Sequence, residues 1–182
     1  SKNSGVYFDM DIVFIKNIDP LWETFKDCDS AISYFNYKGH TYFSIGMVAS
    51  NGNNYLFESL YKKSISLMDD SFGYQGCGKV TVESLIAQLA QEGSKRSNPF
   101  AMLEECYDQN IFNLDNVIYP FQWDEDAARF YDVHSDIDQG HFGIHWFGGR
   151  PVSQVFNEML NEDNFRKHAN SVCYFIDKAY SL

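Results

Sequence analysis

The chain has few basic residues, no long apolar run and no closely spaced cysteines. Its 14 Lys and Arg face 25 Asp and Glu, giving a formal net charge of −11, which argues against a surface that binds nucleic-acid phosphates. The four cysteines contain no Cys-x-x-Cys pair, so zinc is not expected. We expect no membrane-spanning helix and no secretory signal, and the absence of any Asn-x-Ser/Thr acceptor leans away from a lumenal location.

Apolar and aromatic side chains, in contrast, are abundant. Hydrophobic residues make up 45% of the 182 residues, with 16 Phe and 12 Tyr, which is enough for one domain with a core and excludes a disordered acidic tail. Periodicity predicts strands at 31–35, 42–48, 116–120 and 142–146. Helices are predicted to begin at Asp19-Pro20, after 51–54 and at Asn98-Pro99, another is predicted to be capped by Thr81 behind a glycine-rich loop at 73–78, and two more cover 152–160 and 165–179. Strands that alternate with helices indicate an α/β fold.

Two aspartates one residue apart, Asp9 and Asp11, interrupt the apolar run near the start of the chain. On an extended backbone, residues two apart project to the same side, so a strand end would aim both carboxylates at one point. Paired carboxylate oxygens suit Mg²⁺ or Mn²⁺ carrying a diphosphate. The same spacing at Asp136 and Asp138 lies beside Gly140 and indicates a turn in which the aspartates cap local amides.

A second cluster, residues 141–151, contains His145, Trp146, Gly148, Gly149 and Arg150. If 142–146 is a strand, His145 lies near its end, and an imidazole can complete a metal shell that two carboxylates begin. The two glycines would let a ligand approach the backbone, and Arg150 at the start of a helix would favour a diphosphate. Trp146 could stack on a sugar or belong to the core, and His145 could equally be a core histidine.

Six short pieces carry a family resemblance, and they follow one another along the chain: Gly-Val-Tyr-Phe-Asp-Met-Asp at 5–11, Lys-Asn-Ile-Asp-Pro-Leu at 16–21, Gly-Met-Val-Ala-Ser at 46–50, the glycine loop at 76–78, Tyr-Pro at 119–120 and Ile-His-Trp at 144–146. In this order they resemble the DXD-containing sugar transferases, glycosyltransferase family 32 and its neighbours. The resemblance implies a GT-A-like, partly Rossmann-like α/β fold with a mixed sheet flanked by helices. It also implies a single catalytic domain over residues 1–182, forming the C-terminal two-thirds of a complete transferase.

The activity implied by the resemblance is transfer of a hexose from a nucleotide diphosphate sugar to a hydroxyl acceptor, with retention of configuration, in polysaccharide or glycan biosynthesis. Asp9, Asp11 and His145 would hold Mn²⁺ or Mg²⁺, and Arg150 would neutralise charge on the leaving group. Asp9, Trp146, Gly148, Gly149 and Arg150 would contact the donor.

The acceptor could be a glycan, a lipid or a protein hydroxyl. The resemblance implies a cytoplasmic location or the cytoplasmic side of a membrane, reached through segments absent from this chain, with the Golgi lumen as an alternative. Two other functions stay open: a truncated, non-catalytic relative that acts as a binding or scaffold subunit, and a phosphohydrolase with Asp9 as nucleophile and Asp11 as acid/base.

Overall fold

A computed structural model describes residues 3–37, 40–68, 73, 76–121, 129, 140–159, 161, 163–164 and 177. The chain divides into two compact units. Unit 1 comprises Ser1–Phe8 and Leu21–Asp115, and unit 2 comprises Asp9–Pro20 and Asn116–Leu182.

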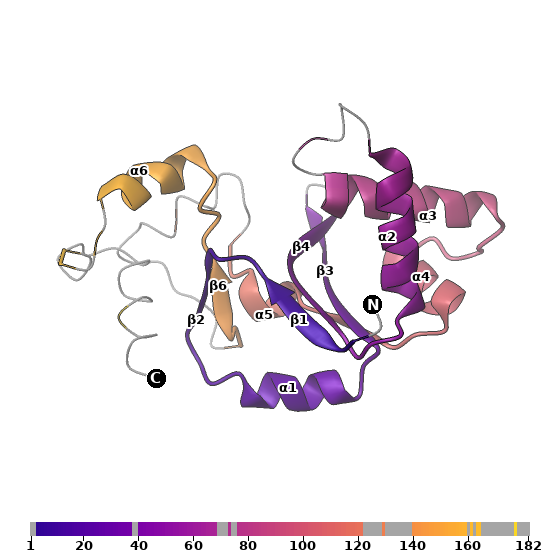
Figure 1. Cartoon of the computed structure of the whole chain (residues 1–182), viewed down its shortest axis with the longest axis horizontal. Coiled ribbons are helices and arrows are strands. Elements are labelled where there is room, and N and C mark those ends of the chain that lie inside the picture. The colour runs from indigo at the N-terminus through magenta and orange to yellow at the C-terminus, as the bar shows by residue number, and fades with distance from the viewer. Residues whose placement is uncertain are drawn as a thin grey trace. The chain divides into compact units, whose positions relative to one another are not determined.

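The elements in chain order are β1 (Gly5–Phe8), β2 (Ile12–Phe14), α1 (Asp19–Lys26), β3 (Ser30–Tyr37), β4 (His40–Ser50), α2 (Tyr55–Leu67), the π-helical turn η1 (Gly76–Val80), α3 (Thr81–Gln91), α4 (Pro99–Tyr107), β5 (Ile111–Asn113), α5 (Asp115–Ile118), β6 (Gly143–His145) and α6 (Pro151–Met159) (Figure 1). Among the described helices, none has the length and apolar composition that crossing a bilayer requires.

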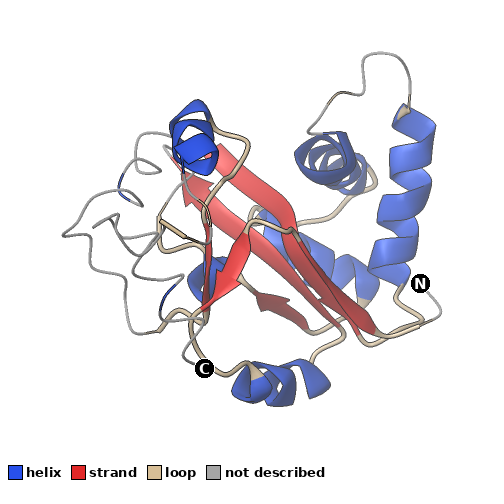
Figure 2. Cartoon of the chain, turned by 60° about the vertical axis from the view of Figure 1, so that its left-hand side comes forward, coloured by secondary structure: helices blue, strands red, loops and turns tan. Residues whose placement is uncertain are grey.

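Unit 1 is built on a mixed four-stranded sheet, and Figure 2 draws the strands in red. The order of the strands is β1-β4-β3-β5. β4 pairs antiparallel with β1 and β3, whereas β5 runs parallel to β3. Cross-strand aromatic pairs hold β3 against β4: the rings of Phe35 and Tyr42 stack at 5.0 Å, and those of Tyr34 and Phe43 lie 5.2 Å apart. The predicted strands at 31–35 and 42–48 are confirmed, and the mixed α/β class with them.

One face of this sheet is covered by helices α2, α3 and α4, which pack against one another. Their apolar side chains form the core of unit 1 with side chains from three strands: Ile32, Phe43, Leu56, Val82, Leu85, Leu103 and Ile111. The predicted helix starts after residues 51–54 and at Asn98-Pro99 are confirmed. Asn98 caps α4 by accepting from the amides of Phe100 and Ala101, and Pro99 occupies its first turn.

The cap of α2, Asn54, also ties the helix to the sheet. Its side chain accepts from Phe57 N at 3.0 Å and donates to Asp29 O at 2.9 Å and to Ser30 Oγ at 2.6 Å. Because Asn54 is buried, Asn54→Ala removes three hydrogen bonds at once and leaves Phe57 N without its cap, and we expect a loss of about 2–3 kcal/mol in the free energy of unfolding. Asn98→Ala, at an exposed cap, should lose only about 1 kcal/mol. Urea unfolding of both variants tests this, and equal losses would contradict it.

The glycine-rich segment before α3 differs from its prediction. From Gly76 onward it forms η1, a π-helical turn that runs directly into α3. Gly78 packs against Ile45 of β4, whose Cγ1 lies 3.4 Å from where a Cβ would be. Thr81, predicted as the helix cap, is instead the first residue of α3. Its buried hydroxyl donates to Gly76 O at 2.6 Å. The hydroxyl therefore closes the π turn instead of capping the helix.

The predicted strand at 116–120 is wrong. The strand of this region, β5, ends earlier at Asn113, and residues Asp115–Ile118 form the short helix α5. The Asn113 side chain causes the change. It accepts from Tyr34 N at 3.0 Å, donates to Tyr34 O at 2.9 Å and accepts from Asp115 N at 3.1 Å. The Asn113 side chain thus takes the hydrogen bonds of the Tyr34 backbone that a further residue of β5 would have made. It also caps the turn that follows.

Unit 2 contains an antiparallel pair of strands, β2 and β6, and helix α6. Ile15, Phe121 and Ile144 form its buried cluster. The predicted strand at 142–146 is confirmed as β6, and the helix predicted over 152–160 is confirmed as α6 as far as Met159. The turn expected at Asp136 and Asp138 lies outside the described residues, as does the helix expected over 165–179 apart from Asp177.

Candidate metal centre

Asp9 and Asp11 lie in a turn, not on an extended strand as the sequence suggested. The turn connects β1 to β2, and Ile12 N donates to Asp9 O across it at 3.3 Å. Met10 at its apex is fully exposed, whereas both aspartates are partly buried. The turn therefore directs the intervening side chain into solvent.

The register of unit 2 brings His145 to this turn. Ile12 of β2 pairs with His145 of β6, and Trp146 N donates to Asp11 O at 3.1 Å. β6 ends at His145 and β2 begins at Ile12, so the imidazole lies beside Asp11, the residue before β2. Strand pairing thus brings His145 next to Asp11, although the two residues are far apart in the sequence.

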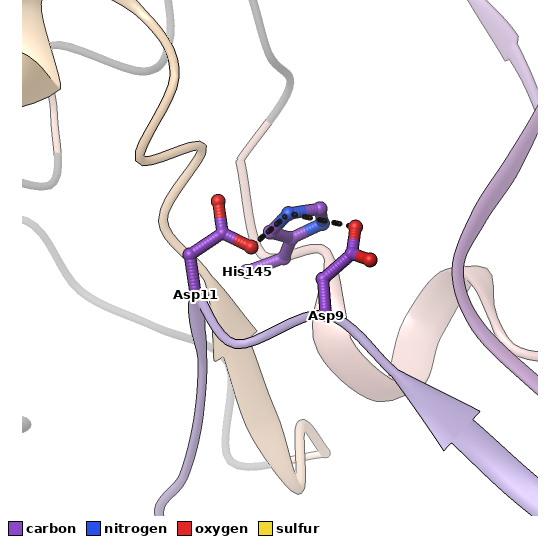
Figure 3. Close-up of side chains that lie close together, drawn as sticks. All are labelled: Asp9, Asp11 and His145. Atoms are coloured by element: carbon purple, nitrogen blue, oxygen red, sulfur yellow. Dashed lines mark ion pairs between the residues drawn. The ribbon is translucent and has the colours of Figure 1, made fainter.

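The three side chains converge (Figure 3). His145 Nε2 lies 3.0 Å from Asp11 Oδ1 and 3.9 Å from Asp9 Oδ2. One ligand atom from each residue lies within 4.8 Å of the other two, and no other such group of three His, Cys, Asp or Glu residues occurs in the described part of the chain.

The distances fit one small divalent cation. With metal–ligand bonds of about 2.1 Å, neighbouring ligand atoms lie about 3 Å apart and opposite ones about 4 Å. Two carboxylates offset the charge of a divalent ion, and an imidazole nitrogen favours Mn²⁺ over Mg²⁺. Asp9, Asp11 and His145 are therefore the residues that could hold such an ion.

The imidazole of His145 is held by aromatic rings. It stacks on Phe147 with centroids 4.7 Å apart and contacts Tyr119 at 5.3 Å. Only 7% of His145 is exposed, and its Nδ1 is buried with no hydrogen-bond partner among the described residues. Nε2 is the nitrogen that faces the carboxylates, so the ring is oriented to bind a cation through Nε2. The buried Nδ1 is not placed to take a proton from a substrate.

Both oxygens of Asp11 are engaged. Oδ1 faces His145, and Oδ2 accepts from Gly148 N at 2.6 Å. Burial raises the pKa of Asp11, but the hydrogen bond and charge of His145, together with the Gly148 amide, outweigh it and hold the pKa below its ordinary value of 3.8. Asp11 is thus a stable anion, suited to binding a cation and unsuited to delivering a proton.

The segment after β6 forms a tight turn, from Phe147 to Arg150, closed by a hydrogen bond from Arg150 N to Phe147 O at 2.9 Å. Phe147 has φ +55°, a left-handed conformation that costs a non-glycine residue about 1–3 kcal/mol. Ser153 Oγ, completely buried in α6, donates to Trp146 O at 3.0 Å. The first turn of α6 therefore anchors the segment that carries Gly148.

The other residues predicted from sequence differ in their surroundings. Gly148 faces Asp11, whereas a Cβ at Gly149 would meet nothing within 4 Å. Trp146 is partly buried against the core of unit 2, and Arg150 directly precedes α6. Phe147 and Tyr119 were not predicted to support His145. Their aromatic character was visible in the sequence, but the contact depends on the left-handed backbone at Phe147, which no sequence pattern indicates.

Unit 1 has a hollow of its own, of about 640 Å³, between α1 and the sheet. Trp22 and Phe25 form its wall, and the small residues Ala31 and Ala49 contribute to its lining. The carboxylate of Asp29 accepts from Asn51 Nδ2 and Asn110 N. That polar group therefore has protein partners, and the lining is mainly apolar.

No protein-family model, curated protein or solved structure matches the chain.

Proposed function

We propose that the chain is the metal-binding catalytic part of a glycosyltransferase with a GT-A-like fold. It would transfer a hexose from a nucleotide diphosphate sugar to a hydroxyl on a glycan, lipid or protein, with retention of configuration. The observation that supports this most is the convergence of Asp9, Asp11 and His145 on one point. The order of the sequence pieces that resemble family 32 adds the reaction class.

In this proposal each side chain has a distinct task. Asp9 and Asp11 supply carboxylate oxygens and His145 supplies Nε2 to Mn²⁺ or Mg²⁺, which when bound provides positive charge for the diphosphate. Arg150 and the amino end of α6 add positive charge from the protein, favouring an anionic leaving group. Trp146 and the Gly148-Gly149 backbone are the proposed donor contacts.

The phosphohydrolase alternative fits the site less well. It requires Asp11 to exchange protons with a substrate, yet both its oxygens have partners and its pKa is lowered. A general acid or base works best with a pKa close to the working pH. The surroundings of Asp11 favour a metal ligand instead.

The proposal is tested by calorimetric titration of the chain with MnCl₂, with UDP or GDP alone, and with either nucleotide after manganese. We expect manganese to bind and one nucleotide to bind only, or much more tightly, when manganese is present. Manganese binding without any linked nucleotide binding would indicate a non-catalytic module and overturn the transferase. The absence of manganese binding would overturn the metal centre itself.

A further inference from the structure

We infer that Gly148 is a positioning residue of the proposed metal centre. Its main-chain N–H holds one oxygen of Asp11, so that the other oxygen faces the His145 nitrogen and the cation. The inference rests on the proposed function, because it concerns how that centre is held in shape. It gives Gly148 a role toward Asp11 that is separate from the donor contact proposed above.

The first support is the hydrogen bond itself. Gly148 N lies 2.6 Å from Asp11 Oδ2, while Asp11 Oδ1 lies 3.0 Å from His145 Nε2. Hydrogen bonds from a backbone amide to a carboxylate are short and strong because the acceptor is charged. With one oxygen held by an amide, the rotation of the carboxylate is restricted, and the second oxygen is directed at the imidazole.

The second support is the space at Gly148. A Cβ there would lie 3.3 Å from each of Asp11 Cβ, Asp11 Oδ2 and Trp146 Nε1. These contacts are tight enough that Asp11 or Trp146 would have to move by a few tenths of an ångström. The φ of Gly148 is not left-handed, so a side chain here would be opposed by the close approach of Asp11 and Trp146 and not by the backbone conformation.

The third support is the neighbouring residue, Phe147. Its left-handed backbone directly precedes the amide of Gly148, and its ring stacks on His145 at 4.7 Å. Two consecutive residues thus contact two of the three proposed ligands, one through a ring and one through an amide. Ser153, which donates to Trp146 O, ties the start of this segment to α6.

Partners that orient metal ligands matter for affinity: removing one typically weakens metal binding 10- to 100-fold. Gly148→Ala keeps the N–H, but its Cβ would lie 3.3 Å from Asp11 Oδ2 and push the carboxylate away from the amide. We therefore expect the variant to raise the Kd for Mn²⁺ by about 10- to 100-fold and to change the zero-field splitting in the Mn²⁺ EPR spectrum. The matched control is Gly5→Ala in β1, where a Cβ would meet nothing within 4 Å. It should leave both the Kd and the spectrum unchanged.

Each result is decisive when the binding is measured where thermal unfolding shows the variants folded. A Kd and spectrum of Gly148→Ala equal to those of the unmodified chain would overturn the inference while leaving the metal centre in place. A chain that does not bind Mn²⁺ at all would instead refute the proposed function.

If Gly148→Ala does not fold, a backbone change replaces it. Substituting an ester for the amide at Gly148 by semisynthesis removes the N–H and adds no Cβ. The same 10-fold or greater rise in Kd is expected, and an unchanged Kd would overturn the inference.

Discussion

Asp11→Ala is expected to lower metal-dependent sugar transfer, or hydrolysis of the nucleotide-sugar donor, by about a hundredfold or more. The variant removes the oxygen that lies 3.0 Å from His145 Nε2 and the anion that the Gly148 amide holds. Loss of one group that binds the charge-stabilising ion should have at least the effect of losing one electrostatic contact to the transition state. Turnover is measured with Mn²⁺ and hexose donors of whichever nucleotide, UDP or GDP, binds in the calorimetric titration.

Two further variants separate charge from folding. Asp11→Asn keeps the size of the side chain and an oxygen that can accept from Gly148, so it removes mainly the negative charge and should lose activity nearly as much. Asp27→Ala removes an exposed carboxylate of unit 1 and should leave turnover unchanged. Full turnover in Asp11→Ala would eliminate Asp11 as a ligand that the reaction needs.

His145→Ala should raise the Kd for Mn²⁺ by more than about a hundredfold, because it removes a ligand and not only a partner that orients one. It also removes a ring that packs against both Tyr119 and Phe147, so the thermal unfolding temperature should fall. The measurements are calorimetric titration with MnCl₂ and a thermal unfolding curve.

His141 supplies the control for this variant. Both histidines are buried in unit 2, yet His141 is not in the cluster of possible metal ligands. His141→Ala should lower the unfolding temperature and leave the manganese affinity unchanged. Equal losses of affinity in the two variants would mean that His145 acts through packing alone.

Much of the candidate site was predictable because each of its residues has a local sequence signal. Asp9 and Asp11 interrupt an apolar run, and His145 follows one. Their convergence could not be derived from spacing alone, since it depends on the turn at Met10 and on the pairing of Ile12 with His145. Strand register is a long-range property that short motifs do not encode.

The fold shows the same division between local and distant causes. Strands β3 and β4 and the capped helix α4 were predicted because their own residues carry the signals, such as Asn98 followed by Pro99. The segment 116–120 was not, because Asn113 of β5 bonds with Tyr34 of β3, which is far away in the sequence. The prediction that Thr81 caps α3 is wrong for a similar reason, because its hydroxyl donates to the carbonyl oxygen of Gly76.

Met10 has a practical consequence. Its side chain is completely exposed, although the residues on both sides of it are proposed ligands. Position 10 therefore accommodates other side chains without steric conflict, and once the exposed free Cys77 and Cys106 are replaced by serine, a cysteine introduced there would accept a fluorescent or paramagnetic label. Such a label would sit one residue from each carboxylate and report ion entry directly, without a substrate.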